Sequence, residues 1–170
     1  MIRFLHLLFL AAGSAALAVP TDWTIEKNPN LQPLSPGASM ERFKVAPSFR
    51  IELVASEPMI REPVALSWDG NGRLFVAEMC GYMQDINGTG AKEPVGRISL
   101  LEDTDWDGKM DKKSLYLERL VEPRAVLAID GGLLVGEPPD LWYCRDSDGD
   151  GKADTKERVA DQFSRRDSNV

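Results

Sequence analysis

The chain carries at residues 103–111 the stretch Asp-Thr-Asp-Trp-Asp-Gly-Lys-Met-Asp, and 43 residues later, at residues 146–154, the stretch Asp-Ser-Asp-Gly-Asp-Gly-Lys-Ala-Asp. Both stretches hold carboxylates at positions 1, 3, 5 and 9 and a glycine at position 6. Carboxylates this close repel one another unless a cation lies among them. A hard ion that prefers oxygen, such as Ca²⁺, matches such a donor set, and glycine permits the bend around it. The pattern therefore predicts two calcium loops.

The predicted ligands follow the spacing of a twelve-residue calcium loop. In the first loop they are Asp103, Asp105, Asp107, Asp111 and the carbonyl of Lys109. In the second they are Asp146, Asp148, Asp150, Asp154, the carbonyl of Lys152 and, at position 12, Glu157. The first loop has Ser114 at position 12, so weaker binding is expected there. The alternative is a pair of acidic hairpin turns that bind no ion.

The segments that lead into the two loops also repeat. Residues 62–78 and 122–137 each combine Glu-Pro, a short apolar strand, a glycine-rich turn and a second strand that ends in glutamate. Third strands are predicted at residues 97–102 and 140–145, directly before the acidic loops, and fourth strands at 114–120 and about 156–160. The alternation of apolar and polar residues at 49–55 predicts one more strand ahead of the first copy.

These predictions define an all-β chain in which residues 43–170 form the first two four-stranded antiparallel blades of an incomplete β-propeller. A propeller needs four or more blades to close, so the sequence is interpreted as a fragment with an unpaired sheet edge. Residues 19–42 contain several prolines and asparagines and are predicted to form an extended lead-in.

Residues 1–18 have the features of a signal peptide, with Arg3 near the start, an apolar run and Ala16-Leu-Ala18 as a cleavage site. An uncleaved N-terminal anchor is the alternative. The expected location is therefore secreted or periplasmic, with membrane association left open. Cleavage would remove His6, the only histidine, which excludes imidazole catalysis and histidine-ligated metal or haem from the remaining residues.

Composition excludes another class of function. The formal net charge of −7 argues against sequence-independent nucleic-acid binding, which requires a basic surface. The two cysteines, Cys80 and Cys144, either form a disulfide, which export would permit, or are two small buried side chains.

Candidate ligand-binding residues are expected at the end of the blades opposite the acidic loops, where the entry segments and the long loop at residues 79–95 meet. Glu78, Tyr82 and Arg124 are the candidates for a substrate or cofactor face, and Arg124 could pair with an anionic group. For each of them the alternative is an ordinary solvated or capped loop residue.

The combination of residues 43–58, residues 72–82, Gly96-Arg97-Ile98 and the two acidic loops resembles the membrane-bound dehydrogenase domain family of environmental bacteria. That family is similar to quinoprotein glucose and sorbosone dehydrogenases. The resemblance implies a propeller that oxidises a sugar or alcohol with pyrroloquinoline quinone and passes electrons to a c-type cytochrome. It also implies a histidine base and quinone ligands from later blades, which would lie beyond Val170.

The sequence thus favours the N-terminal part of an exported, calcium-stabilised, quinoprotein-like dehydrogenase, which would not be catalytic by itself. The alternative is a non-catalytic extracellular calcium-binding propeller that binds a glycan or a protein. Catalytic residues are not identifiable within this sequence.

Overall fold

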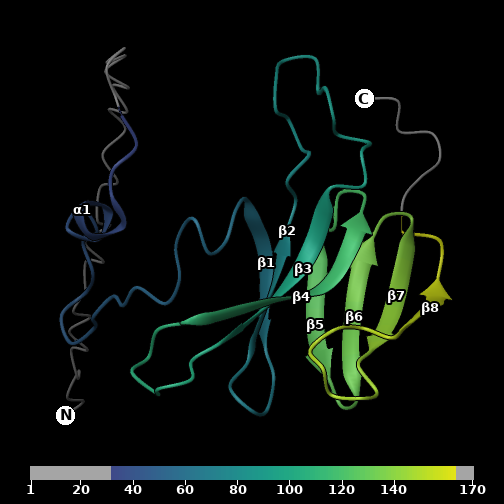
Figure 1. The fold of residues 1–170 in the computed structure, drawn as a ribbon. Helices are drawn as coiled ribbons and strands as arrows, with labels where there is room; N and C mark the ends of the chain where they lie inside the picture. The colour runs from purple at the N-terminus through teal and green to yellow at the C-terminus, as the bar shows by residue number, and fades with distance from the viewer. Residues whose placement is uncertain (1–31, 164–170) are drawn as a thin grey trace, which may run out of the picture. The chain divides into compact units, whose positions relative to one another are not determined.

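The computed structural model describes residues 32–163, whose regular secondary structure is almost entirely β (Figure 1). The first sheet contains β1 (Pro63–Trp68), β2 (Leu74–Glu78), β3 (Gly96–Glu102) and β4 (Lys112–Leu120). The second contains β5 (Ala125–Ile129), β6 (Gly132–Glu137), β7 (Asp140–Arg145) and β8 (Thr155–Ala160). Each sheet has its four strands in sequence order, and every neighbouring pair is antiparallel. The predicted all-β class and the two four-stranded antiparallel sheets are confirmed.

The register shows that the two sheets are copies of one unit. Ala65 pairs with Ala77 in the first sheet as Ala125 pairs with Gly136 in the second, and Leu100 pairs with Phe75 as Tyr143 pairs with Leu134. In a meander the β1–β2 turn and the β3–β4 loop lie at the same end of the sheet. The two acidic loops are the β3–β4 and β7–β8 connections, so each lies at the hairpin-turn end of its sheet.

A shared hydrophobic core joins the two sheets, which belong to one compact unit that starts at Leu34. The first sheet contributes Phe75, Ala77, Ile98, Leu100, Tyr116 and Leu120, and the second contributes Val126, Leu133, Val135 and Cys144. The backbone N–H of Ala128 in β5 donates a hydrogen bond of 3.0 Å to the Ser67 hydroxyl of β1, which links the first strands of the two sheets. The sheets therefore pack through one face each.

The opposite face of the first sheet has a second, smaller core. Leu74, Val76, Leu101 and Met110 are buried there beneath the incoming chain, which contributes Val54, Ala55, Met59 and Ile60. This face of the sheet is thus covered by a segment without regular structure.

Two predictions about the segment before β1 are wrong, and residues 19–31 of the predicted lead-in lie outside the described residues. Residues 36–40 form a one-turn helix, α1 (Pro36–Met40), because Ser35 accepts a hydrogen bond from the Ala38 N–H and Pro36 has a φ suited to a first helical position. Residues 49–55, predicted as a strand, form none, because no neighbouring strand among the described residues pairs with them.

The predicted signal peptide at residues 1–18 lies outside the described residues. Within residues 32–163, no helix has the length and apolar character that crossing a membrane requires. Cys80 and Cys144 are both free thiols, and Cys144 is fully buried in the shared core, where burial raises its pKa to about 11.

Candidate metal centre

Each acidic loop brings three carboxylates together. Oxygens of Asp103, Asp105 and Asp111 lie within 4.8 Å of one another in the first loop. Oxygens of Asp146, Asp148 and Asp154 do the same in the second. Three oxygens at this separation have the spacing of ligands around one ion, because Ca²⁺ takes oxygen ligands at roughly 2.3–2.6 Å. Six of the eleven predicted ligands are thus gathered into two equivalent groups.

Hydrogen bonds give the two loops the same conformation. The glycine N–H at position 6 donates to the first aspartate in both, from Gly108 to Asp103 and from Gly151 to Asp146, each at 2.9 Å. Both glycines are left-handed, with φ values of 90° and 87°, which is the bend that glycine at this position was predicted to permit. The spacing of the sequence therefore encodes a loop shape as well as a charge.

The aspartate at position 9 is held from across the loop. Asp111 accepts hydrogen bonds from the N–H and hydroxyl of Thr104, and Asp154 accepts the same pair from Ser147. The bonds from the Ser147 hydroxyl and N–H hold the pKa of Asp154 below its ordinary value. This position-2 hydroxyl is a part of the loop that the sequence reasoning missed, although Thr and Ser stand at the same place in the two copies.

The other predicted ligands lie outside the two groups. Asp107 and Asp150 accept hydrogen bonds from the backbone N–H groups of Lys109 and Lys152, each at 2.8 Å. Glu157 lies on β8, where it forms an exposed ion pair of 3.6 Å with Arg145. An arriving ion would have to draw these groups inward, or take water, to complete a shell of six or more oxygens.

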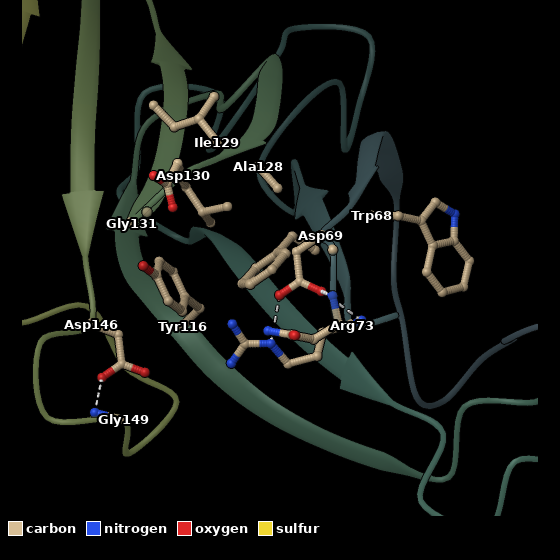
Figure 2. A pocket seen from close by; sticks show the side chains of 15 residues that line it. Trp68, Asp69, Arg73, Tyr116, Ala128, Ile129, Asp130, Gly131, Asp146 and Gly149 are labelled. Atoms are coloured by element: carbon tan, nitrogen blue, oxygen red, sulfur yellow. Dashed lines mark hydrogen bonds and ion pairs between the residues drawn. The ribbon is translucent and has the colours of Figure 1, made fainter.

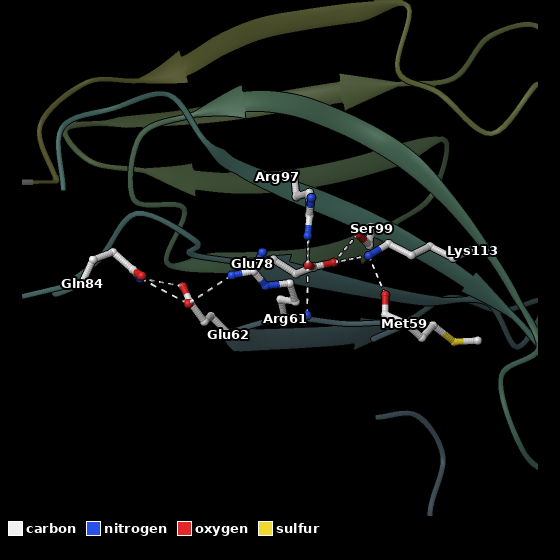
Figure 3. A network of polar contacts seen from close by, with 8 residues as sticks. All are labelled: Met59, Arg61, Glu62, Glu78, Gln84, Arg97, Ser99 and Lys113. Carbon is white, nitrogen blue, oxygen red and sulfur yellow. Dashed lines mark hydrogen bonds and ion pairs between the residues drawn. The ribbon is translucent and has the colours of Figure 1, made fainter. Parts of the chain in front are cut away.

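Glu78, predicted to lie at a substrate or cofactor face, is instead a buried anion with a structural role (Figure 3). Its carboxylate is fully inaccessible and accepts hydrogen bonds from the Ser99 hydroxyl, Arg97 at 2.7 Å, Lys113 at 2.8 Å and the Arg61 backbone N–H at 3.1 Å. Burial acts to raise the pKa of Glu78, but the hydrogen bonds from Arg97, Lys113 and Ser99 outweigh it and lower the pKa below its ordinary value. A carboxylate with this many donors has no free lone pair for a substrate.

The second copy repeats this arrangement with fewer partners. Glu137, at the end of β6, accepts hydrogen bonds from the Val121 backbone N–H and from Lys156, both at 2.7 Å. Val121 and Lys156 stand where Arg61 and Lys113 stand in the first copy. In both copies, the glutamate that ends the second strand therefore has a structural role. Its hydrogen bonds connect the segment before the first strand with the fourth strand.

The other two candidates for a ligand-binding face, Tyr82 and Arg124, have different neighbours. Tyr82 is 47% exposed in the loop after β2 and lines a shallow hollow with Glu62, Met79, Met83 and Gln84. Arg124 is exposed at the start of β5 and pairs with Glu122 at 2.5 Å. Among the described residues, no hydrogen bond or ion pair joins Tyr82 and Arg124 to each other or to Glu78, and their shared ligand-binding face stays a prediction.

A cavity of about 640 Å³ lies between the sheets at the hairpin-turn end (Figure 2). Arg73 and Tyr116 line it from the first sheet, and Asp130, Gly131 and Asp146 line it from the second. Arg73 donates from Nε to Asp69 at 2.7 Å, and burial raises the pKa of Tyr116 to about 12. The sequence did not predict this cavity, because it arises from the angle between two sheets and not from a local pattern.

The fold and the loops define a class, that of an all-β protein built from repeated four-stranded sheets that each carry an acidic loop. Residues 35–170 match the family model described as Domain of unknown function (DUF7133), and the chain belongs to this family. Neither the curated proteins nor the solved structures contained a match.

Proposed function

We propose that this chain forms two blades of a β-propeller in an exported protein, and that Ca²⁺ bound in the acidic loops stabilises each blade. The observation that carries the proposal is the convergence of three carboxylates in each of two loops with the same hydrogen bonds. Carboxylate oxygens are the ligands that Ca²⁺ prefers. The role is structural, because each loop joins the last two strands of a sheet.

The propeller is supported by the way the sheet faces repeat. Phe75, Ala77, Ile98 and Leu100 face the second sheet in the shared core. Their register equivalents in the second sheet are Leu134, Gly136, Leu141 and Tyr143. These alternate with the core residues Leu133, Val135 and Cys144, so they lie on the face turned away from the first sheet. The second sheet therefore has, on its outward side, the equivalent of the face by which the first sheet packs on the second. A third sheet could pack there in the same way, which is the head-to-tail packing of blades.

The N-terminal sequence supports export, as a signal peptide would direct it. The resemblance extends the proposal to a quinoprotein-like dehydrogenase that oxidises a sugar or alcohol and transfers electrons to a c-type cytochrome. Residues 32–163 contain no histidine and supply no base of the kind that such enzymes use, so no catalytic step is assigned to them. A propeller that binds glycan or protein without catalysis is the rival function, and dye reduction by the longer protein with added quinone and a panel of sugars and alcohols separates the two.

Calcium binding is tested by calorimetry and thermal unfolding of the chain after chelation. We expect two ions per chain, and each site should add about 2.7 kcal/mol of stability when free Ca²⁺ is 100 times its Kd. Asp146→Asn should reduce the stoichiometry to one ion, because it removes one of the three carboxylates of the second group.

Asp161→Asn is the matched control, since Asp161 is an exposed aspartate outside both loops. It should leave two ions bound. Absence of both binding heat and a rise in melting temperature would refute the calcium proposal.

A further inference from the structure

In each acidic loop, the backbone N–H at position 8 donates a hydrogen bond to a carbonyl outside the loop's own sheet. At position 8 of the second loop, the N–H of Ala153 donates a hydrogen bond of 2.8 Å to the carbonyl of Tyr116, which belongs to the fourth strand of the preceding sheet. At position 8 of the first loop, the N–H of Met110 donates a bond of 2.9 Å to the carbonyl of Val54. Val54 thus occupies, relative to the first sheet, the place that Tyr116 occupies relative to the second.

Tyr116 can make this bond because it lies at an irregularity of its strand. Leu115 pairs with Ser99 and Leu117 pairs with Ile98, so Tyr116 has no partner in β3. An extra residue of this kind is left out of the ladder, and its carbonyl is free to bond elsewhere. By equivalence Val54 is such an extra residue, and Leu53 and Ala55 correspond to Leu115 and Leu117.

The packing around Val54 supports the same equivalence. Val54, Ala55, Met59 and Ile60 pack on Leu74, Val76, Leu101 and Met110. The equivalents of those four in the second sheet are Leu133, Val135, Cys144 and Ala153, and they lie against the core to which Tyr116, Leu117 and Leu120 contribute. The segment before β1 therefore covers the first sheet in the same way as β4, the fourth strand of the first sheet, covers the second sheet.

A fourth strand needs a third strand beside it, and among residues 32–163 none pairs with residues 50–55. We propose that residues 50–55 are the outer strand of a further four-stranded sheet of this repeat. Strands one to three of that sheet come from the same polypeptide outside these 170 residues. The inference rests on the proposed propeller. It names the segment that closes the ring, in which one strand from the start of the domain joins a three-stranded sheet.

A second copy of the chain does not fit this place. Both of its sheets already have a fourth strand, β4 or β8. Packed on the first sheet in the repeated manner, that fourth strand would need the space that Val54 and Ala55 hold. The partner is therefore a sheet of three strands with a free edge.

Hydrogen exchange on the complete polypeptide, expressed from its own reading frame, tests the inference against the 170-residue chain. We expect amides in residues 50–55 to exchange about 100-fold more slowly in the complete polypeptide, because exchange then requires the added strand to detach. Equal exchange in the two proteins would overturn the inference, and so would a reading frame that ends at Val170.

Leu53→Pro sharpens the test, because proline removes a backbone donor and is poorly tolerated within a sheet. It should lower the melting temperature of the complete polypeptide and abolish the slow exchange. In the 170-residue chain, where Leu53 pairs with none of the described strands, it should shift the melting temperature by less than about 2 °C. Lys44→Pro, in the exposed segment upstream, is the matched control and should change neither protein. If Leu53→Pro changed neither the melting temperature nor the exchange of the complete polypeptide, the inference would be contradicted. The proposed function is tested separately, by the calcium stoichiometry of the 170-residue chain.

Discussion

Glu78 shows how one side chain can be misassigned by its place in the sequence. It ends a strand next to a long loop, which is a common position for a functional carboxylate. In the folded chain its carboxylate is enclosed by Arg97, Lys113 and Ser99, and it ties β2 to β3 and β4. The basic partners are 19 and 35 residues away in the sequence, so no local pattern could reveal them.

Removal of this carboxylate should destabilise the protein strongly. Breaking a buried ion pair by removing one partner costs about 3–5 kcal/mol, because the remaining charges stay desolvated. We expect Glu78→Ala to lower the free energy of unfolding by that amount in chemical denaturation. Glu118→Ala, at an exposed position on β4, is the control and should change it by less than about 0.5 kcal/mol.

The pH dependence of stability offers an independent check on the same residue. The pKa of Glu78 is below its unfolded value of 4.5, so the carboxylate stabilises the fold above that pH, and this stability is lost as pH falls through the lower folded-state value. Glu78→Gln should therefore flatten the acid side of a curve of unfolding free energy against pH. An unchanged acid limb would mean that other carboxylates dominate it.

At the scale of elements, the hairpins depend on glycines with different tasks. Gly132 begins β6, and a Cβ there would collide with the Cys144 carbonyl and approach the Tyr143 ring to 2.9 Å. Gly70 lies in the equivalent turn of the first sheet. A Cβ added at Gly70 would have nothing within 4 Å, and the φ of Gly70 is not left-handed. The two turns look alike in sequence, but only one glycine is required by packing.

Gly132→Ala should therefore destabilise the chain by about 1–3 kcal/mol, the usual cost of forcing an extra carbon into a packed region. Gly70→Ala is the matched substitution and should be neutral or slightly stabilising, because it reduces the entropy of the unfolded chain. Thermal unfolding of both variants checks this, and equal losses would show that the close approach to β7 relaxes easily.

At the scale of the whole molecule, the free face of the second sheet sets the behaviour of the chain in solution. Leu127 is 54% exposed and pairs with Leu134, which lies on the same face as Leu141 and Tyr143. Contiguous apolar surface of this kind promotes association when nothing covers it. We expect the 170-residue chain to associate with rising concentration in sedimentation velocity.

Leu127→Lys should weaken this association while leaving the melting temperature nearly unchanged, because the side chain packs in neither core. Ile86→Lys is the control, since Ile86 is more exposed but lies in a loop away from the sheet faces, and it should not alter the association. A chain that stays monomeric without either substitution would argue that the face is too small or too curved to self-associate.

The sequence by itself determined the parts of this protein that depend on short spacing. The glycine turns, the eight strands and the shape of the acidic loops follow from alternation and from residues within a few positions of one another. Even the helical turn at Pro36–Met40 had a local signal in Ser35 and Pro36, which the count of prolines concealed.

Only the tertiary structure decided which residues meet across long separations. It enclosed Glu78, opened a cavity between the hairpin turns and, within residues 32–163, left residues 50–55 without a strand partner. The physical reason is that burial, ion pairing and strand addition depend on the partner that arrives from elsewhere in the chain. A segment with a strand pattern becomes a strand only when a neighbouring backbone takes up its hydrogen bonds.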